Sequence, residues 1–263
     1  MTYRGAGQFG ADGPVLLLTA MAQEACELRS RMAVSRRVAS VVSEDFLEAT
    51  LGNLAVVSGT CGIGKVAAAA TTAAAIERFE PSAVVLAGIS GSLSAHAPLG
   101  AMVVVEAAIH HDFDCRPIAA REGQLPGRDA VAFEADGVLK AALADSMARY
   151  SAGGWSGPAL VGEVCSGDQL VAEARARDLI SMRFPDALCL DMETAAVAQV
   201  CEGAKVPWSA LRMVSDQADE SFSAQAVLSW CQDVAAPAMA EVVTGALGGL
   251  ALEGRAEARE KVQ

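Results

Sequence analysis

The amino-acid sequence predicts an α/β fold with a single domain, in which helices flank a central mixed, mostly parallel sheet. Three observations support this prediction. Short continuous apolar runs alternate with longer helix-forming segments, which is the pattern of a sheet covered on both faces. The chain has 263 residues, a length that suits one large domain. Hydrophobic residues make up 52% of the chain and aromatic residues only 5%, so small aliphatic side chains fill the core.

Strands are predicted where a few apolar residues follow one another between turn-forming residues. Because helices cover both faces of a parallel sheet, its strands read as continuous apolar runs. The stretch Arg37–Gly59 alternates apolar and polar residues in short runs instead, and so predicts antiparallel strands. In chain order, the continuous runs are Val15–Thr19, Ala83–Ala87, Ala101–Ala108, Ala159–Cys165, Ala187–Leu190 and Trp208–Val214.

Helices are predicted for most of the segments that connect these strands. The clearest case is the Ala-rich stretch Lys65–Phe79, which Pro81 ends because proline cannot continue a helix. Residues 116–130 show no periodicity and contain Gly123, Pro126 and Gly127, so we expect a long loop there. The predicted helices are, in chain order, 23–32, 65–79, 135–152, 192–203 and 224–247.

The ends of the chain differ from the part between them. Residues 1–13 are rich in glycine and polar groups and predict a flexible tail, the domain is expected over 14–250, and 251–263 form a charged, helix-prone C-terminal tail. The apolar run Val15–Leu18 is short and follows Asp12, so we interpret it as a buried strand rather than a secretory signal. We expect no stretch long and apolar enough to span a membrane.

Charge and cysteine content narrow the functional classes. The formal net charge of -12 opposes binding to nucleic acids or anionic membranes. The seven cysteines are odd in number and none has CxxC spacing, which favours reduced thiols in a cytoplasmic protein. The three histidines show no metal-ligand spacing, so we expect neither a metal nor a cofactor.

Polar residues gather where the predicted strands end. Ligands of α/β folds bind beyond the carboxyl ends of the strands, so we expect these segments to share one edge of the sheet. They predict an enzyme or a small-molecule binder. The segments are Gly88–Ser92, Ser166–Asp168, Asp191–Glu193 and Ser215–Asp216.

Individual acids in these segments suit general acid–base chemistry. Asp216 follows an apolar strand, where desolvation raises a carboxyl pKa, but an aspartate there also serves as a turn residue or helix cap. Glu193 is suited to binding ribose hydroxyls or to stabilising a helix start. Glu24 follows the first predicted strand and opens a helix, so it is suited to orienting a water or to stabilising the start of that helix. The neighbours His111 and Asp112 are interpreted as structural, and taken alone each acid fits its structural role better.

Seven stretches together resemble the nucleoside phosphorylase and nucleosidase superfamily, most of all its bacterial 5'-methylthioadenosine/S-adenosylhomocysteine nucleosidase branch. They occur in family order over roughly residues 14–245. The resemblance implies a nucleoside phosphorylase-like fold and a homodimer. The stretches are Thr19–Glu24, Gly62–Val66, His111–Asp114, Gly123–Gly127, Ser166–Asp168, Asp191–Ala196 and Arg212–Asp216.

The resemblance also implies catalytic roles. Asp216, assisted by Ser215, is similar to the general acid that protonates purine N7. Glu193 is similar to the ligand of the ribose hydroxyls, and Glu24 to the base that positions the attacking water. Arg212 is similar to the arginine beside that water.

Four further positions are expected to contact the substrate. Met192 would pack under the sugar and the main chain of Val171 would meet the purine edge. Leu170 stands where the family usually stacks an aromatic ring, and Ile89 where these nucleosidases commonly have a serine. These two departures imply a reshaped, more apolar pocket.

The expected reaction is hydrolysis of the N-glycosidic bond of a purine nucleoside, which gives the free base and a ribose derivative. Related phosphorylases place an arginine just before the glycine strand end, where this chain has Leu86-Ala87-Gly88, and Glu24 would repel phosphate. Three alternatives stay open at this point: a purine nucleoside phosphorylase, a nucleosidase for a futalosine-type compound, and a binding protein without turnover. A dinucleotide-dependent oxidoreductase is not favoured, because the chain lacks its glycine fingerprint.

Overall fold

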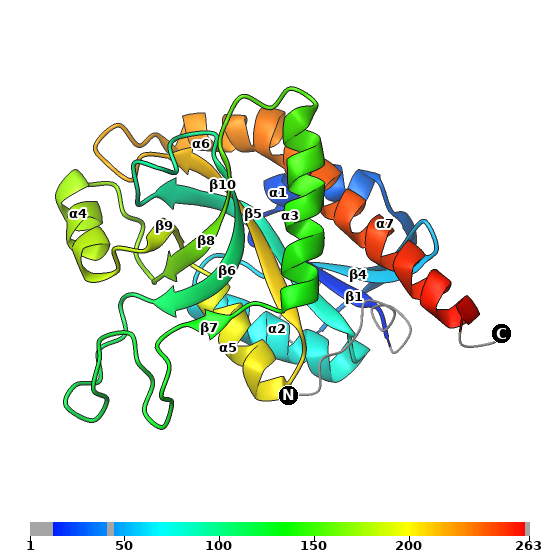
Figure 1. Ribbon diagram of the computed structural model, residues 1–263, viewed down its shortest axis with the longest axis horizontal. Coiled ribbons are helices and arrows are strands. Elements are labelled where there is room, and N and C mark those ends of the chain that lie inside the picture. Colours follow the sequence, from blue (N-terminus) through cyan, green and yellow to red (C-terminus); the bar gives the residue numbers. More distant parts are fainter. Residues whose placement is uncertain (1–12, 41–44, 261–263) are drawn as a thin grey trace.

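The computed structural model describes residues 13–40 and 45–260. The flexible tail predicted for residues 1–13 therefore lies, except for Gly13, outside the described residues. One curved sheet forms the centre of the described chain, and helices surround it (Figure 1). The strands are β1 (Val15–Thr19), β2 (Ala33–Val38), β3 (Phe46–Leu51), β4 (Leu54–Thr60), β5 (Ala83–Ser92), β6 (Met102–His110), β7 (Phe133–Glu134), β8 (Ala159–Ser166), β9 (Ala187–Asp191) and β10 (Trp208–Asp216).

Helices occupy five of the nine connections between consecutive described strands, and the helix Lys65–Phe79 has the predicted bounds. Glu80 ends it in the left-handed conformation, one residue before Pro81. The helices are α1 (Ala22–Ser30), α2 (Lys65–Phe79), α3 (Gly137–Ala152), α4 (Ala174–Arg183), α5 (Thr194–Ala204), α6 (Ala224–Trp230) and α7 (Ala236–Glu260).

The sheet is mixed, as predicted, but parallel pairs do not dominate it. Among the described strands, five neighbouring pairs are parallel and five are antiparallel. The strand order is β10-β6-β8-β9-β5-β1-β4-β3-β2, and β10 also pairs with β5. This extra pairing closes β5, β9, β8, β6 and β10 into a ring. The predicted antiparallel stretch Arg37–Gly59 corresponds to β2, β3 and β4.

Two apolar cores lie on opposite faces of the sheet. Along β1, Val15 and Leu17 face the core formed with α1, α3 and α7, while Leu16 and Leu18 face the core formed with α2 and α5. All five residues of β1 are buried for this reason. The continuous apolar runs of the sequence thus mark strands that are covered on both faces, as expected.

Several predicted bounds need correction. The strand predicted at Ala83–Ala87 continues through Ser92, because β10 and β9 pair with the segment that was expected to be a turn. The strand predicted at Ala101–Ala108 runs from Met102 to His110. Helix α4 and the short strand β7 were not predicted; Ile180 is the one residue of α4 that is buried, so an apolar stripe is missing from its sequence.

The last predicted helix is interrupted. Cys231–Ala235 forms a π-helical turn between α6 and α7. Pro237 explains the interruption, because it has no N–H to donate to the carbonyl group four residues earlier and its ring clashes with that group. Helix α7 then continues to Glu260, into the segment expected to be a charged tail.

The expectation that no stretch could span a membrane also needs correction. The run Ala224–Leu252 has 29 residues and is long and apolar enough by length and composition. However, 56% of its most apolar window is buried inside the protein, where α7 packs against α1 and α3. Burial of this kind is expected of a core helix in a globular fold.

Candidate active site

Arg212 lies at the centre of a buried cluster of polar side chains. It belongs to β10, is 0% exposed, and pairs with Gly88 of β5 across the sheet. Its Nε lies 2.7 Å from Oδ2 of Asp191, and its Nη2 lies 3.8 Å from Oε2 of Glu193. Burial opposes the charge of Arg212, but the neighbouring carboxylates outweigh this effect and raise its pKa. The guanidinium is therefore held permanently charged inside the fold.

Asp191 orients the arginine and the start of helix α5. Its Oδ1 accepts from Ser166 Oγ at 2.5 Å and from the N–H groups of Glu193 and Thr194 at 3.2 Å each. Thr194 donates its hydroxyl to Asp191 and accepts hydrogen bonds from Nε and Nη2 of Arg212, at 3.0 and 2.8 Å. Asp191, rather than Glu193, thus takes the structural role at the helix start.

The Glu193 side chain is consequently free to face the site. It is 5% exposed, and its Oε1 accepts a hydrogen bond of 2.9 Å from the N–H of Gly64. Burial and then the charge of Asp191 raise the pKa of Glu193 to about 7, although Arg212 and Gly64 act in the opposite direction. A carboxyl group with this pKa changes protonation near neutral pH.

Glu24 is fixed by three backbone donors. Its Oε2 accepts from the N–H groups of Ala20 and Met21 at 2.8 Å each, and its Oε1 accepts from Ile89 N–H at 2.9 Å. The first two bonds stabilise the start of α1, while the third ties Glu24 to the end of β5. Burial raises the pKa of Glu24, against the charge of Arg212 and these hydrogen bonds. Glu24 thus combines its structural role with a place in the cluster.

Gly88 marks the point where Glu24 and Arg212 meet. A Cβ atom at this position would lie 2.2 Å from Arg212 Nη1 and 2.7 Å from Glu24 Oε1. Nη1 of Arg212 has no hydrogen-bond partner among the described residues. One carboxylate oxygen and one charged donor therefore approach the backbone of β5 at the same point, and only glycine allows this close approach.

Ser215 and Asp216 lie farther along the same pair of strands. Asp216 pairs with Gly91 of β5, three residues beyond Gly88, which corresponds to about 10 Å. Its Oδ2 accepts from Ser215 Oγ at 2.8 Å and its Oδ1 from Ala218 N–H at 2.9 Å. Burial raises the pKa of Asp216, although these two bonds lower it. Asp216 is both a turn residue and a half-buried acid at the strand end.

The structure brings the polar clusters together by a route other than the expected one. Strands β8 and β9 run antiparallel to β5, so the four clusters do not sit at the ends of strands that share one direction. They meet because the strand ring closes: Leu190 at the end of β9 pairs with Gly91 near the end of β5. The four polar segments therefore lie close together as expected, but they do so because the strands close into a ring.

The four positions expected to contact a substrate are placed unevenly. Ile89 follows Gly88 and is partly buried, as is Met192 between Asp191 and Glu193. Val171 is 5% exposed, whereas Leu170 is 64% exposed and contributes little to the core.

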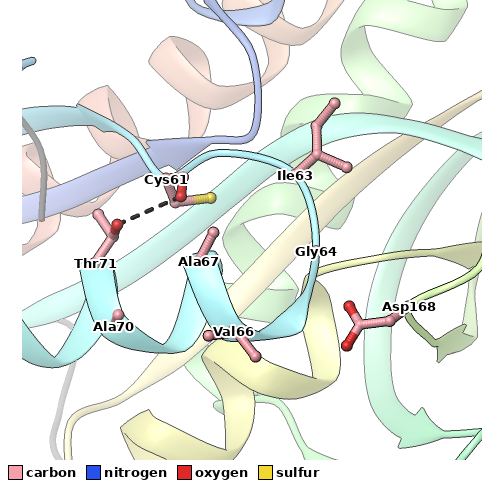
Figure 2. A pocket seen from close by; sticks show the side chains of 8 residues that line it. All are labelled: Cys61, Ile63, Gly64, Val66, Ala67, Ala70, Thr71 and Asp168. Carbon is pink, nitrogen blue, oxygen red and sulfur yellow. Dashed lines mark hydrogen bonds between the residues drawn. The ribbon is translucent and has the colours of Figure 1, made fainter.

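A surface hollow of about 580 Å³ lies at the start of α2 (Figure 2). It borders the acid cluster through Gly64, whose N–H binds Glu193. The side chains of Ile63 and Val66 are 59% and 79% exposed at this hollow. Its lining residues are Cys61, Ile63, Gly64, Val66, Ala67, Ala70, Thr71 and Asp168.

Sequence reasoning missed the shell that holds Arg212 in place. Ser166, Asp191 and Thr194 all lie in stretches that the sequence singled out, but no role was given to them. Their polar character at strand ends was visible; that they surround one buried arginine depends on which strands pair, which a single sequence does not specify. Across the described residues, no group of histidine, cysteine and acidic side chains is arranged to hold a metal ion.

Buried carboxylates around one arginine, with a half-buried acid on the same strand pair, are typical of an α/β enzyme that acts on a small molecule. The chain belongs to the phosphorylase superfamily, whose family model matches residues 14–248.

Individual relatives agree with this assignment. The 5'-methylthioadenosine/S-adenosylhomocysteine nucleosidase of Anoxybacillus flavithermus is 32% identical over 202 residues, which cover 77% of this chain and 84% of the relative. The Colwellia psychrerythraea nucleosidase of the same name, solved in complex with adenine, has a TM-score of 0.84 and 28% identity, and the match covers 92% of this chain and 97% of that one. The futalosine hydrolase of Helicobacter pylori has a TM-score of 0.80 and 25% identity, with 91% and 99% of the chains covered.

Proposed function

We propose that this enzyme hydrolyses the N-glycosidic bond of a purine nucleoside of the 5'-methylthioadenosine or S-adenosylhomocysteine type. The products are the free purine base and a ribose derivative. The observation that carries this proposal is the meeting of Glu24 and Arg212 beside Gly88, with Glu193 and Asp216 at the same strand ends. The similarity to nucleosidases of that name supports the substrate class.

Asp216 would serve as the general acid. Cleavage leaves negative charge on the departing base, and a proton delivered to purine N7 makes the base a better leaving group. An ordinary aspartate is deprotonated at neutral pH, but burial raises the pKa of Asp216. Ser215 holds the carboxyl group through its hydroxyl, which also donates to the carbonyl oxygen of Ser90.

Glu193 would bind the ribose hydroxyls. Its Oε1 is oriented by Gly64, while Oε2 faces Arg212. As the bond breaks, positive charge develops on the sugar, and buried carboxylates stabilise this charge more strongly than they would in water. Met192 precedes Glu193 and would pack against the sugar.

Glu24 and Arg212 would hold the attacking water. Glu24 Oε1 can accept a proton from the water, and Arg212 Nη1 can donate to its oxygen, because both atoms face the spot beside Gly88. The raised pKa of Glu24 makes it a stronger base than an exposed glutamate.

Water is the favoured acceptor because of the charge balance. The pKa of Arg212 is raised by three carboxylates, those of Asp191, Glu193 and Glu24. The positive charge of the arginine is therefore already balanced by negative charge. A phosphate dianion needs several uncompensated donors, and here it would meet Glu24 instead. Hydrolysis therefore fits the electrostatics of the cluster better than phosphorolysis.

The identity of the nucleoside can be tested with a substrate panel. Methylthioadenosine, S-adenosylhomocysteine, adenosine, inosine and futalosine are incubated separately with the protein, and the free base is separated by chromatography. We expect the two adenine thio-nucleosides to react fastest. A preference for futalosine would favour the second candidate, which the similarity to the futalosine hydrolase and the unusual residues Ile89 and Leu170 support. Release of base from none of them would contradict the proposed function.

We further propose that the protein acts as a cytoplasmic homodimer. The exposed side chains of Ile63 and Val66 form an apolar surface beside the hollow at α2, and a surface of this kind is typical of a protein contact. All seven cysteines are free thiols, as expected in a reducing compartment.

A further inference from the structure

Acidic side chains from two distant segments hold the start of helix α2. The helix begins after Gly64, and no side chain at that position caps it. The first N–H groups of a helix need partners from outside the helix. Gly64 N–H donates to Glu193 Oε1 at 2.9 Å, and Lys65 N–H donates to Asp168 Oδ1 at 2.7 Å. Figure 2 shows the Asp168 carboxylate facing the turn at Gly64.

Asp168 is itself part of a closed ring of hydrogen bonds. Its N–H donates to Oδ2 of Asp112 at 2.9 Å, and Oδ1 of Asp112 accepts from Nζ of Lys65 at 2.5 Å. The Lys65–Asp112–Asp168 ring thus joins the start of α2 to the segments that follow β6 and β8. The side chains of Lys65 and Asp112 are only 19% and 21% exposed, so water screens their ion pair less than a fully exposed pair.

The backbone packs closely around the ring at two glycines. Gly64 has a φ of +96°, which glycine adopts without strain, and a Cβ there would lie 3.1 Å from Asp168 Oδ1. A Cβ on Gly167, the residue before Asp168, would lie 2.3 Å from Nε2 of the buried His111. Displacing Lys65 or Asp168 would therefore move the Gly64 N–H as well.

We propose that Lys65, Asp112 and Asp168 are positioning residues, whose ring holds the Gly64 N–H against the carboxylate of Glu193. None of the three is bonded to Glu193 directly. They act through one backbone donor, which orients Oε1 of Glu193 and leaves Oε2 toward Arg212. The ring thus joins three segments that the sequence singled out, namely Gly62–Val66, His111–Asp114 and Ser166–Asp168.

The pKa of Glu193 depends on the hydrogen bond from the Gly64 N–H. The groups that face Glu193 are Asp191 and Glu24, which raise its pKa, and Arg212 and the Gly64 N–H, which lower it. Cys61 lies nearby, but burial raises the pKa of its thiol to about 12, so it stays neutral. Losing the Gly64 hydrogen bond would raise the pKa of Glu193 further, because a donor to a carboxylate stabilises its charged form.

The test is an NMR titration of the Glu193 carboxyl carbon in protein labelled with ¹³C-glutamate, assigned with Glu193→Gln. In Lys65→Met, which removes the ammonium group but keeps most of the stem, we expect the midpoint to rise by roughly half a pH unit or more. Asp112→Asn should shift it in the same direction. Asp114→Asn is the matched control: it removes an aspartate two residues away whose partner is the exposed Arg116, and should leave the midpoint unchanged.

Activity gives a second readout. Because the role of Glu193 rests on the proposed function, Lys65→Met should also lower kcat/KM for base release by roughly tenfold, as small misplacements of catalytic groups do. An unchanged Glu193 midpoint in both ring variants, with their circular dichroism spectra intact, would overturn the positioning role. If the ring variants show the shifted midpoint but the wild-type protein releases no base, the positioning role is upheld and the proposed function is rejected.

Discussion

At the scale of single residues, the candidate site concentrates carboxyl groups in a place that is largely shielded from bulk solvent. Burial is the largest influence on the pKa of Glu24, Glu193 and Asp216, and it raises all three. Such carboxyl groups can hold or release protons at pH values where exposed acids are fully ionised. The same burial makes the site costly for the stability of the fold.

The role of Asp216 predicts a specific loss of activity. Asp216→Asn removes the proton donor but keeps the shape and one accepting oxygen for Ala218 N–H, so base release should fall by about 10²–10⁴ while the fold survives. The wild-type rate should fall as pH rises through the pKa of Asp216, and this limb should be absent in the variant. Chromatography of free base against pH checks both points, and unchanged turnover would remove Asp216 from this role.

The raised pKa of Glu193 predicts an effect on stability. A carboxyl whose pKa rises from 4.5 to about 7 on folding binds more protons in the folded state, so its contribution to stability is lost between these pH values as pH increases. Glu193→Gln should therefore raise Tm at pH 8, by roughly 2–4 °C for each kcal/mol gained, and should change it little at pH 4. Thermal unfolding at both pH values measures this; an equal effect at both would contradict the assignment.

The sequence indicated the candidate site residues clearly, but it did not indicate the side chains that hold them in place. Glu24, Glu193 and Asp216 come soon after predicted apolar strands, while Arg212 lies within one, and the family resemblance assigned all four to one site. The ligands of Arg212 could not be foreseen, because Thr194 and Ser166 look like ordinary helix-start and turn residues. Their partners are fixed by the closure of the strand ring, which is a non-local property.

At the scale of elements, the local pattern predicted strands and helices well where both faces are buried. β1 and α2 have the predicted bounds, since an apolar run or an Ala-rich run defines each without help from neighbours. β5 is longer than predicted because pairing with β9 and β10 extends it through two glycines. α4 carries no apolar stripe, and so its sequence resembles a loop.

Helix α7 offers a matched pair of glycines for a test of helix stability. A Cβ on Gly248 would meet nothing within 4 Å, so Gly248→Ala should stabilise the protein by about 0.5–1 kcal/mol through helix propensity. A Cβ on Gly245 would lie 2.5 Å from Ser146 Oγ of α3, so Gly245→Ala should gain less or lose stability. Urea unfolding compares the two; a larger gain for Gly245→Ala would contradict this packing.

At the scale of the whole molecule, the closed strand ring determines where the site lies. The sequence predicted convergence from strands of one direction, whereas β8 and β9 oppose β5 and reach the site through the pairing of β9 with the end of β5. The fold class could be predicted from alternating elements, but half of the pairings among the described strands are antiparallel. Strand direction depends on long-range pairing, which local periodicity does not encode.

The proposed homodimer predicts a change in size on mutation. Val66→Glu puts a charge on the exposed apolar surface beside the hollow at α2, and burying that charge in an interface is unfavourable. Light scattering after gel filtration should show a monomer for this variant and a dimer for the wild type. Val34→Glu, at the 51% exposed Val34 of strand β2, is the control and should stay dimeric. A dimer in both variants would contradict an interface at α2.

The most direct measurement for the account as a whole is the phosphate dependence of adenine release from methylthioadenosine. Wild-type protein and Asp216→Asn are assayed in phosphate-free buffer and in saturating phosphate, and both the base and the sugar product are identified. We predict equal wild-type rates in the two buffers, a free ribose derivative, and a strongly reduced rate for Asp216→Asn in both. Base release only in phosphate, with a sugar 1-phosphate as product, would contradict the assignment of Glu24 and Arg212 to an attacking water.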